Sequence, residues 1–195
     1  MYPIILASQS PRRKMLLEWA CVPFDVVVVE TAEDYPLSMP AAEVPAFIAS
    51  NKAGAVVNKL ATEKKDIATF FVIAADTIVV LGDSILGKPK DRTHAIETLK
   101  MLSGKTHQVI TGVCIVYKTQ TYTFSEITEV SFHNLTEQQI CFYVDEFKPY
   151  DKAGAYGIQD WIGVVGIKEI KGDFYNVMGL PVSKLLQKIK QLEML

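Results

Sequence analysis

The chain has 195 residues, of which 49% are hydrophobic and 22% are charged, as is ordinary for a soluble globular protein. This length suffices for one substantial core or for two small lobes that share one. Its formal net charge of −2 argues against a general nucleic-acid-binding protein, because such proteins usually carry a basic excess. No apolar run approaches the ~18 residues that a bilayer span needs, and the N-terminus lacks the basic and apolar regions of a secretion signal. We therefore expect neither a membrane nor a nucleic acid as a partner.

The chain opens with an apolar run over residues 4–7, which predicts a short buried strand, a turn and then a helix. Ser10 is a favourable N-cap, and Pro11 suits the first helical position. The turn at Ser8 therefore presents free backbone N–H groups and the positive end of the helix dipole. Arg12 and Arg13 oppose that dipole, which makes physical sense where an anion occupies this turn, because guanidinium groups bind phosphate oxygens bidentately. An ordinary helix start with solvated arginines is the alternative.

The next predicted elements are a strand over residues 24–29, rich in β-branched residues, and a helix that ends near residue 61. An acidic loop over residues 31–39 lies between them and carries Glu33. The helix carries Lys52, for which a place on a solvated face is the alternative to a functional role.

An apolar run over residues 70–81 predicts a central strand or a strand pair with Asp76 and Thr77 in its middle. Because burying an ionised carboxylate without a partner is expensive, Asp76 must lie at a strand end, coordinate a cation or pair with a base. Buried structural aspartates also occur as turn and cap residues, but the pattern favours a functional Asp76.

Turn-forming and helix-capping residues define the next connections between elements. Gly82 and Asp83 form a hairpin turn signal, and the basic loop that follows carries Lys88. Asp91 then caps a helix. Two antiparallel strands are predicted beyond it, joined near Thr119.

The last third begins with a helix opened by a capping box of Thr136 and Gln139. Residues 151–159, which end at Gln159, are polar and rich in glycine. Such a run lets backbone approach a ligand closely, although it is also common in ordinary loops. A hairpin is predicted at residues 171–173, before a closing helix.

Strands and helices alternate early and antiparallel pairs follow, which predicts an α/β fold with a mixed sheet. Polar residues without an evident structural role gather in three stretches, at residues 8–13, 76–90 and 151–159. Two lobes around a cleft would let these stretches converge.

Several motifs in the same order resemble the Maf family of nucleoside triphosphate pyrophosphatases over nearly the whole chain. They are Leu6-Ala7-Ser8-Gln9-Ser10-Pro11-Arg12-Arg13, Ala75-Asp76-Thr77, Gly87-Lys88-Pro89, Leu102-Ser103-Gly104, Asp151-Lys152-Ala153-Gly154-Ala155-Tyr156-Gly157-Ile158-Gln159 and Val177-Met178-Gly179-Leu180-Pro181. The resemblance implies an inosine-triphosphatase-like architecture, with a mixed twisted sheet and flanking helices, as one domain over residues 1–195. The glycine-rich motif is similar to that of the branch acting on dTTP and UTP rather than the branch preferring 7-methyl-GTP.

The resemblance also implies a reaction, in which a nucleoside triphosphate is hydrolysed between its α and β phosphates to a nucleoside monophosphate and pyrophosphate. Asp76 matches the catalytic base, and with Glu33 it would hold a divalent metal cation, Mg²⁺ or Mn²⁺. The matches to residues that bind substrate or set substrate choice are Ser8, Arg12, Arg13, Lys52, Thr77, Lys88 and Gln159. Asp160 and Trp161 depart from the family pattern, because a glycine is usual after Gln159.

A nucleotide-binding regulator of cell division or septum formation without turnover is the alternative function. Asp76 argues against it, because a carboxylate would repel a bound polyphosphate unless a metal intervened. The chain has an odd number of cysteines, and they are widely spaced: Cys21, Cys114 and Cys141. This pattern suits a reducing cytoplasm and offers neither a disulfide framework nor a zinc site. The sequence leaves the oligomeric state open, a homodimer included.

Overall fold

The computed structural model describes residues 3–118 and 120–194. The strands within these ranges form one mixed seven-stranded sheet in the order β2-β1-β3-β5-β6-β7, with β4 paired to β3. The chain divides into two compact units. Unit 1 comprises Met1–Asp76, Thr111–Glu126 and Gly179–Leu195, and unit 2 comprises Thr77–Ile110 and Ile127–Met178. The predicted α/β class with a mixed sheet is confirmed.

Unit 1 is built on parallel strands. β1 (Ile4–Leu6) pairs in parallel with β2 (Phe24–Val26) on one side and with β3 (Phe71–Leu81) on the other. All of β1 is buried, which fits its purely apolar sequence, because a parallel strand covered on both faces needs no polar side. β2 ends at Val26, so the strand predicted to reach residue 29 is shorter than expected.

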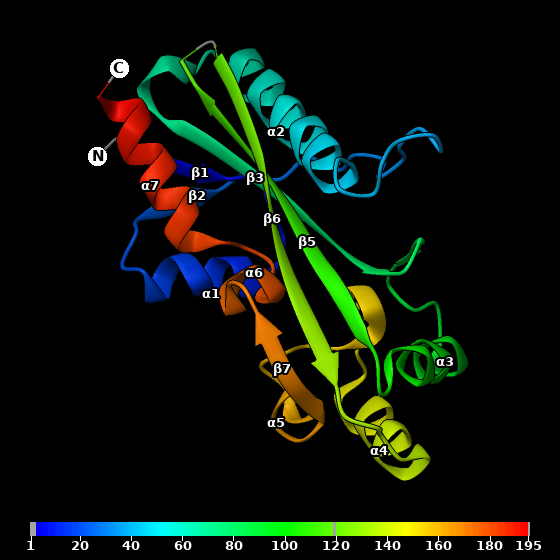
Figure 1. Ribbon diagram of the computed structural model, residues 1–195. Helices are drawn as coiled ribbons and strands as arrows, with labels where there is room; N and C mark the ends of the chain where they lie inside the picture. Colours follow the sequence, from blue (N-terminus) through cyan, green and yellow to red (C-terminus); the bar gives the residue numbers. More distant parts are fainter. Residues whose placement is uncertain (1–2, 119, 195) are drawn as a thin grey trace. The chain divides into compact units, whose positions relative to one another are not determined.

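The helices of unit 1 bury apolar faces. α1 (Pro11–Trp19) begins at its proline, and α2 (Val44–Thr62) buries small and aliphatic side chains such as Ala49, Ala53 and Leu60. A Cβ on Gly112 would overlap the backbone of Ala46, so the start of α2 packs directly against a neighbouring strand (Figure 1). The short η1 (Ile67–Thr69) precedes β3, and α7 (Val182–Glu193) ends the chain.

In unit 2, β3 turns at Gly82, whose φ is +58°, into the antiparallel β4 (Ser84–Leu86). α3 (Arg92–Leu102) and α4 (Glu137–Phe147) begin at the predicted caps: Asp91 accepts a hydrogen bond from His94 N at 2.8 Å, and the capping box of Thr136 and Gln139 is formed. The strands β5 (Thr106–Tyr117) and β6 (Gln120–Phe132) end at the predicted residues but begin earlier than the starts that the sequence predicts, Val109 and Tyr122. Thr119, their predicted junction, lies outside the described residues.

The run over residues 70–81 is one strand, which is the first of its two predicted alternatives, because no turn residue interrupts it. One local prediction is wrong. The turn at residues 171–173 does not close a hairpin: β7 (Ile167–Lys171) pairs with the distant β6, and the chain continues into α6 (Phe174–Met178). The other short elements, η2 (Ala153–Ala155) and α5 (Trp161–Gly166), are too brief for a hydrophobic period to reveal.

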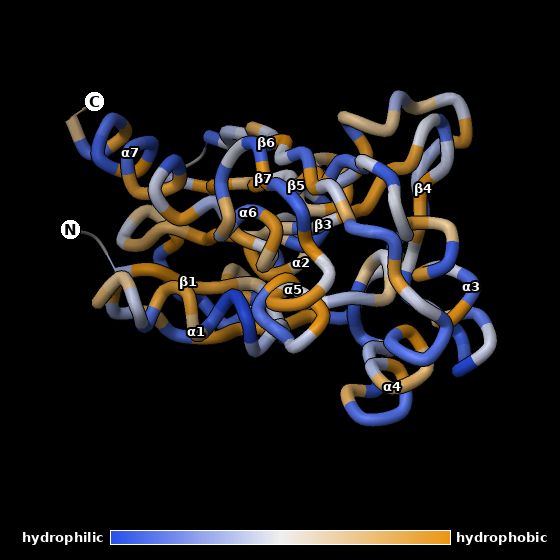
Figure 2. Tube along the Cα trace, turned by 60° about the horizontal axis from the view of Figure 1, so that its bottom comes forward, coloured by the Kyte–Doolittle hydropathy of each residue, from blue (hydrophilic) through white to orange (hydrophobic). Residues whose placement is uncertain are grey.

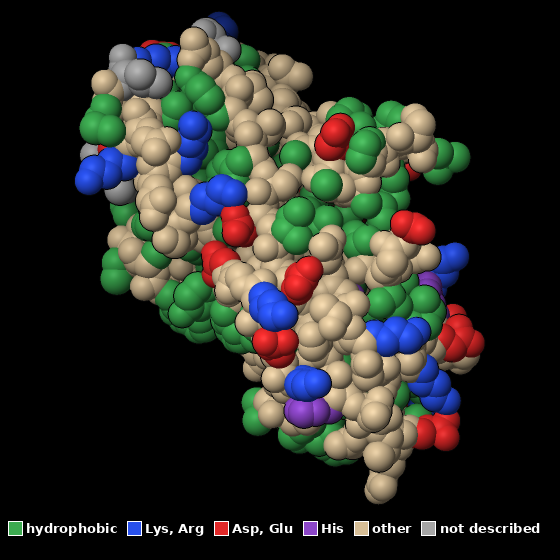
Figure 3. Space-filling model, in the orientation of Figure 1, with side chains coloured by type: hydrophobic (Ala, Val, Ile, Leu, Met, Phe, Trp, Pro, Cys, Tyr) green, Lys and Arg blue, Asp and Glu red, His purple; other side chains and the backbone are tan. Residues whose placement is uncertain are grey.

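Figure 2 shows hydrophobic residues along β1, whereas much of α7 is hydrophilic. On the face shown in Figure 3, basic and acidic side chains are interspersed rather than gathered by sign. Among the described residues, none of the helices has the length and apolar character that a bilayer span requires.

Candidate active site

The centre of the candidate site in unit 1 is an ammonium group between two carboxylates. Lys52 Nζ lies 2.7 Å from Glu33 Oε1 and 2.6 Å from Asp76 Oδ1. The side chains of Lys52 and Asp76 are 18% and 13% exposed, whereas that of Glu33 is 47% exposed. A position for Lys52 on a solvated face is therefore wrong, and Asp76 pairs with a base, one of the three arrangements that its burial allows.

The local sequence explains why these groups meet. The first five residues of β3 are buried, and Asp76 is the first that is partly exposed. Lys52 lies on α2 beside the fully buried Ala53, and the small residues of this helix let it pack closely against the strands. The packing of α2 thus places the Lys52 ammonium beside the first partly exposed residue of β3.

Arg13 ties the first turn of α1 to a distant part of unit 1. Its Nε donates to the carbonyl oxygen of Gly179 at 2.8 Å, and its Nη1 donates to Ser8 Oγ at 3.1 Å. Ser8 Oγ also accepts from the backbone N–H of Ser10 at 3.2 Å. Ser10 occupies the predicted N-cap position, but its side chain makes no capping hydrogen bond. Ser8 and Arg13 therefore define the shape of this turn.

Electrostatic coupling joins this turn to the carboxylates. Arg13 is buried, and desolvation lowers the pKa of its guanidinium. The charge of Asp76 and, more weakly, that of Glu33 raise the same pKa, while the like charge of Arg12 lowers it. The structure thus brings together the predicted unit 1 residues, which are Ser8, Arg12, Arg13, Glu33, Lys52 and Asp76. We call them the Asp76 cluster.

Glu33 and Asp76 suit a divalent cation, because their oxygens already face one positively charged group. Mg²⁺ is usually bound through one or two carboxylates, with substrate phosphates and water completing its shell. The protein therefore offers two carboxylates at this point. The described residues contain no group of three or more His, Cys, Asp or Glu side chains placed to hold a metal.

The other predicted site residues, Thr77, Lys88 and Gln159, belong to unit 2. Thr77 is half-buried, and Lys88 and Gln159 are exposed. The basic loop and the glycine-rich stretch meet here, because Gly154 N donates to the carbonyl oxygen of Gly87 at 3.1 Å. Gly154 has a φ of +68°, and a Cβ there would lie 2.9 Å from the side chain of Val79, so glycine is required.

Two buried tyrosine hydroxyls hold the glycine-rich stretch in place, and neither was assigned a role from the sequence. Tyr156 shares a hydrogen bond of 2.7 Å with His107 Nε2, and the hydroxyl of Tyr143 contacts both Gly157 and Asp160. Burial raises the pKa of both tyrosines well above the ordinary value. A tyrosine on the buried face of a helix is a usable sequence signal, because its hydroxyl needs a partner, but that signal does not identify the partner.

The pKa of His107 provides a stability test of this support. Burial lowers it from 6.5 to about 4, and protonation would leave a buried N–H at Nδ1, which has no hydrogen-bond partner among the described residues. The neutral form is therefore favoured by folding, so its contribution is complete above about pH 6.5 and declines as the pH falls toward 4. The wild-type protein should lose about 2 kcal/mol more than the His107→Gln variant between about pH 7 and about pH 4.5.

Urea unfolding followed by circular dichroism at both pH values measures this difference. His133→Gln, at an exposed position of unit 2, is the matched control and should follow the wild type. Parallel pH dependence in His107→Gln and wild-type protein would contradict the role of His107.

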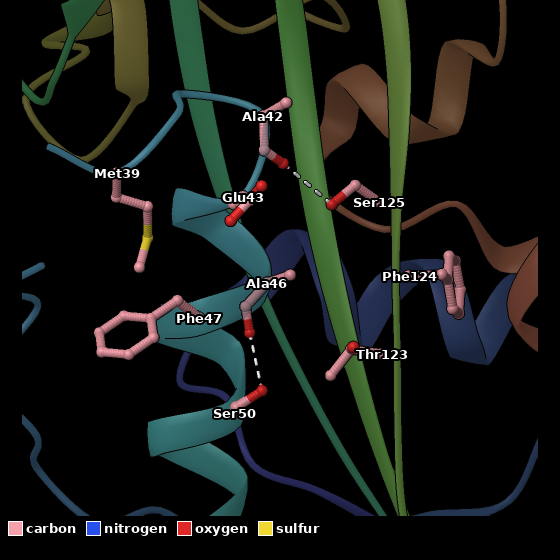
Figure 4. Close-up of a pocket in the computed structure, with 9 residues that line it drawn as sticks. All are labelled: Met39, Ala42, Glu43, Ala46, Phe47, Ser50, Thr123, Phe124 and Ser125. Atoms are coloured by element: carbon pink, nitrogen blue, oxygen red, sulfur yellow. Dashed lines mark hydrogen bonds between the residues drawn. The ribbon is translucent and has the colours of Figure 1, made fainter. Parts of the chain in front are cut away.

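A shallow pocket of about 340 Å³ lies elsewhere in unit 1, and none of the predicted site residues lines it. Figure 4 shows Phe47 on the first turn of α2 and Met39 in the segment before this helix. Ser125 donates to the carbonyl oxygen of Ala42 at 3.2 Å. Ser50 is engaged with the carbonyl oxygen of Ala46 at 2.9 Å. The lining is mainly apolar and offers no convergent set of groups for phosphate chemistry.

The family model described as Maf-like protein matches residues 3–192. A protein of Cytophaga hutchinsonii named dTTP/UTP pyrophosphatase is 48% identical over 97% of this chain and 84% of its own length. A protein of the same name from Porphyromonas gingivalis is 45% identical over 97% of this chain and 94% of its own length. Among solved structures, the Staphylococcus aureus Ham1 protein matches 67% of this chain and 71% of its own, with a TM-score of 0.45 at 14% identity. The family assignment does not depend on this distant likeness: the sequence match over nearly the whole chain shows that the protein belongs to the Maf-like family.

Proposed function

We propose that this protein is a nucleoside triphosphate pyrophosphatase that hydrolyses dTTP and UTP between the α and β phosphates. The names of its full-length relatives support the activity, and the Asp76 cluster supports the chemistry. The observation that carries the proposal is the half-buried Asp76 carboxylate, which lies 2.6 Å from Lys52 Nζ and interacts electrostatically with Arg13. A catalytic carboxylate in a cationic setting is what hydrolysis of a polyphosphate needs.

The cationic groups would bind the phosphates and stabilise their negative charge. A triphosphate carries three to four negative charges, and in-line attack by water leaves the protein mainly to position groups and stabilise charge. Arg12 and the N-terminal end of α1 supply positive charge at the turn that Arg13 and Ser8 hold in place. Lys52 and, from unit 2, Lys88 would bind phosphate oxygens as ammonium groups.

Asp76 would act as the general base. Its Oδ1 is engaged by Lys52, which fixes the carboxylate and leaves the other oxygen to accept a proton from the attacking water. A bound Mg²⁺ or Mn²⁺ ion, held by Asp76 and Glu33, would neutralise phosphate charge and stabilise the leaving pyrophosphate. Thr77 and Gln159 carry donor and acceptor groups that suit recognition of a pyrimidine edge.

The expected compartment is the cytoplasm. Cys21, Cys114 and Cys141 are all free in the structure, which is consistent with a reducing environment. Burial raises the pKa of the Cys114 thiol, so this cysteine is a core residue rather than a nucleophile.

Product analysis tests the proposed reaction. Purified protein with Mg²⁺ or Mn²⁺ should convert UTP to UMP and pyrophosphate in equal amounts, as resolved by ion-exchange chromatography. Removing the metal with EDTA should reduce the rate to background, and excess Mg²⁺ should restore it, because Glu33 and Asp76 provide too few ligands for a tightly held ion. Formation of UDP and phosphate would contradict the assigned bond, and an EDTA-resistant rate would contradict the metal requirement.

A further inference from the structure

One buried hydroxyl contacts both ends of the four-residue segment 157–160. Tyr143 on α4 is fully buried, and its hydroxyl accepts from Gly157 N at 3.0 Å and donates to Asp160 Oδ2 at 2.7 Å. The segment also closes on itself, because Asp160 N donates to the carbonyl oxygen of Gly157 at 3.0 Å. Tyr143 thus spans a tight turn as donor at one end and acceptor at the other.

Gln159 has the one exposed side chain within this turn. Gly157 and Ile158 are buried, and Asp160 is half-buried. The start of α5 supports the turn from its other side, since Gly163 N donates to the carbonyl oxygen of Asp160 at 2.9 Å. A Cβ on Gly163 would overlap the carbonyl oxygen of Ile158, so helix and turn are in direct backbone contact. The backbone that carries Gln159 therefore has little freedom.

The Asp160 carboxylate occupies space that a larger residue at position 157 would need. A Cβ on Gly157 would lie 2.5 Å from Asp160 Oδ2. Lys152 Nζ lies 3.9 Å from the same oxygen, and its own side chain is only 14% exposed. Burial, followed by the hydrogen bond to Asp160, raises the pKa of Tyr143, so the hydroxyl remains a donor at neutral pH.

We propose that Tyr143 and Asp160 are positioning residues that hold the Gln159 amide in the orientation in which it reads the pyrimidine base of the substrate. The inference rests on the proposed function, in which Gln159 contacts the base. Uracil and thymine present a donor between two acceptors, and an amide offers both complementary groups. Such pairing discriminates between bases only when the amide is held in register, since a misplaced partner leaves polar groups unpaired.

Two conservative variants test the proposal, each with the same substitution at an exposed site of unit 2 as its control. Tyr143→Phe removes the shared hydroxyl and Asp160→Asn removes the charge, while Tyr175→Phe and Asp145→Asn alter exposed side chains. With UTP, KM should rise about five- to tenfold in Tyr143→Phe, as expected for lost hydrogen bonds, with kcat changed less than about twofold. The preference for UTP over CTP should fall by a similar factor, and Asp160→Asn should show the same change more weakly. Both controls should match the wild type.

Hydrogen–deuterium exchange of the peptide covering residues 154–162 provides a readout that is independent of turnover. Exchange should be faster in Tyr143→Phe and Asp160→Asn than in the wild type or the controls, because the amide of Gly157 loses or loosens its acceptor.

The outcomes separate this inference from the proposed function. Active variants that keep the wild-type preference for UTP over CTP would overturn the inference alone, whatever their exchange rates. An equal loss of kcat on every nucleotide would also overturn it, because that pattern marks a purely structural role. A wild-type protein that splits no nucleoside triphosphate would overturn the proposed function and this inference with it.

Discussion

Asp76→Asn is expected to lower kcat for UTP hydrolysis by a factor on the order of 10² or more, because an amide cannot take a proton from the attacking water. The substitution preserves size and leaves an amide oxygen that can still accept from Lys52 Nζ, now 2.6 Å from Oδ1. The fold should therefore remain intact. KM should change much less than kcat, since Lys52 and the arginines still face the phosphates.

Steady-state pyrophosphate release measures both constants, and thermal unfolding confirms that the variant is folded. Asp83→Asn is the matched control, because Asp83 lies in the exposed turn after β3 and belongs to no part of the proposed site. Its kcat should equal that of the wild type. Unchanged turnover in Asp76→Asn would require a different base.

Arg13→Met is expected to destabilise the protein by about 2–4 kcal/mol, since it leaves buried acceptors without their donor. The Gly179 carbonyl and Ser8 Oγ both accept from this guanidinium, at 2.8 and 3.1 Å. Arg13→Lys should recover little of the loss, because an ammonium group cannot reproduce two directed guanidinium hydrogen bonds.

Urea unfolding gives the free energy of unfolding from the transition midpoint, provided that the slope is unchanged. Lys14→Met, in the same turn of α1 but only half-buried, is the control and should cost less than about 1 kcal/mol. If Arg13→Met were as stable as the control, the guanidinium would be a solvated side chain, as in the alternative of an ordinary helix start, and not a buried donor that holds the turn.

Features that depend on neighbours in the chain could be predicted from the sequence. The start of α1 at Pro11, the Asp91 cap, the capping box at Thr136 and the turn at Gly82 all appear where expected. Each depends on the conformational preference or hydrogen bonding of residues within four positions. The hairpin predicted at residues 171–173 failed because the partner of β7 is β6, some forty positions earlier, and not the residues after the turn.

In the candidate site, too, the residue types could be predicted from the sequence, whereas the contacts between distant residues could not. Its residue types were identified in advance through family motifs, and the cost of burying Asp76 required a partner for it. The identity of that partner came only with the fold, when the packing of α2 placed Lys52 between Asp76 and Glu33. Arg13 likewise contacts Gly179, 166 positions away.

By itself, the sequence determined the α/β class, the starts of several helices and which polar residues needed explaining, because periodicity, caps and desolvation costs act locally or on single groups. Only the tertiary structure decided which side chains meet: Lys52 with two carboxylates, Arg13 with a carbonyl near the C-terminus, and Tyr143 with both ends of the Gln159 turn. The physical reason is that hydrogen bonds and ion pairs act over a few ångströms in space, and no local pattern specifies which distant segments the packed core brings within that range.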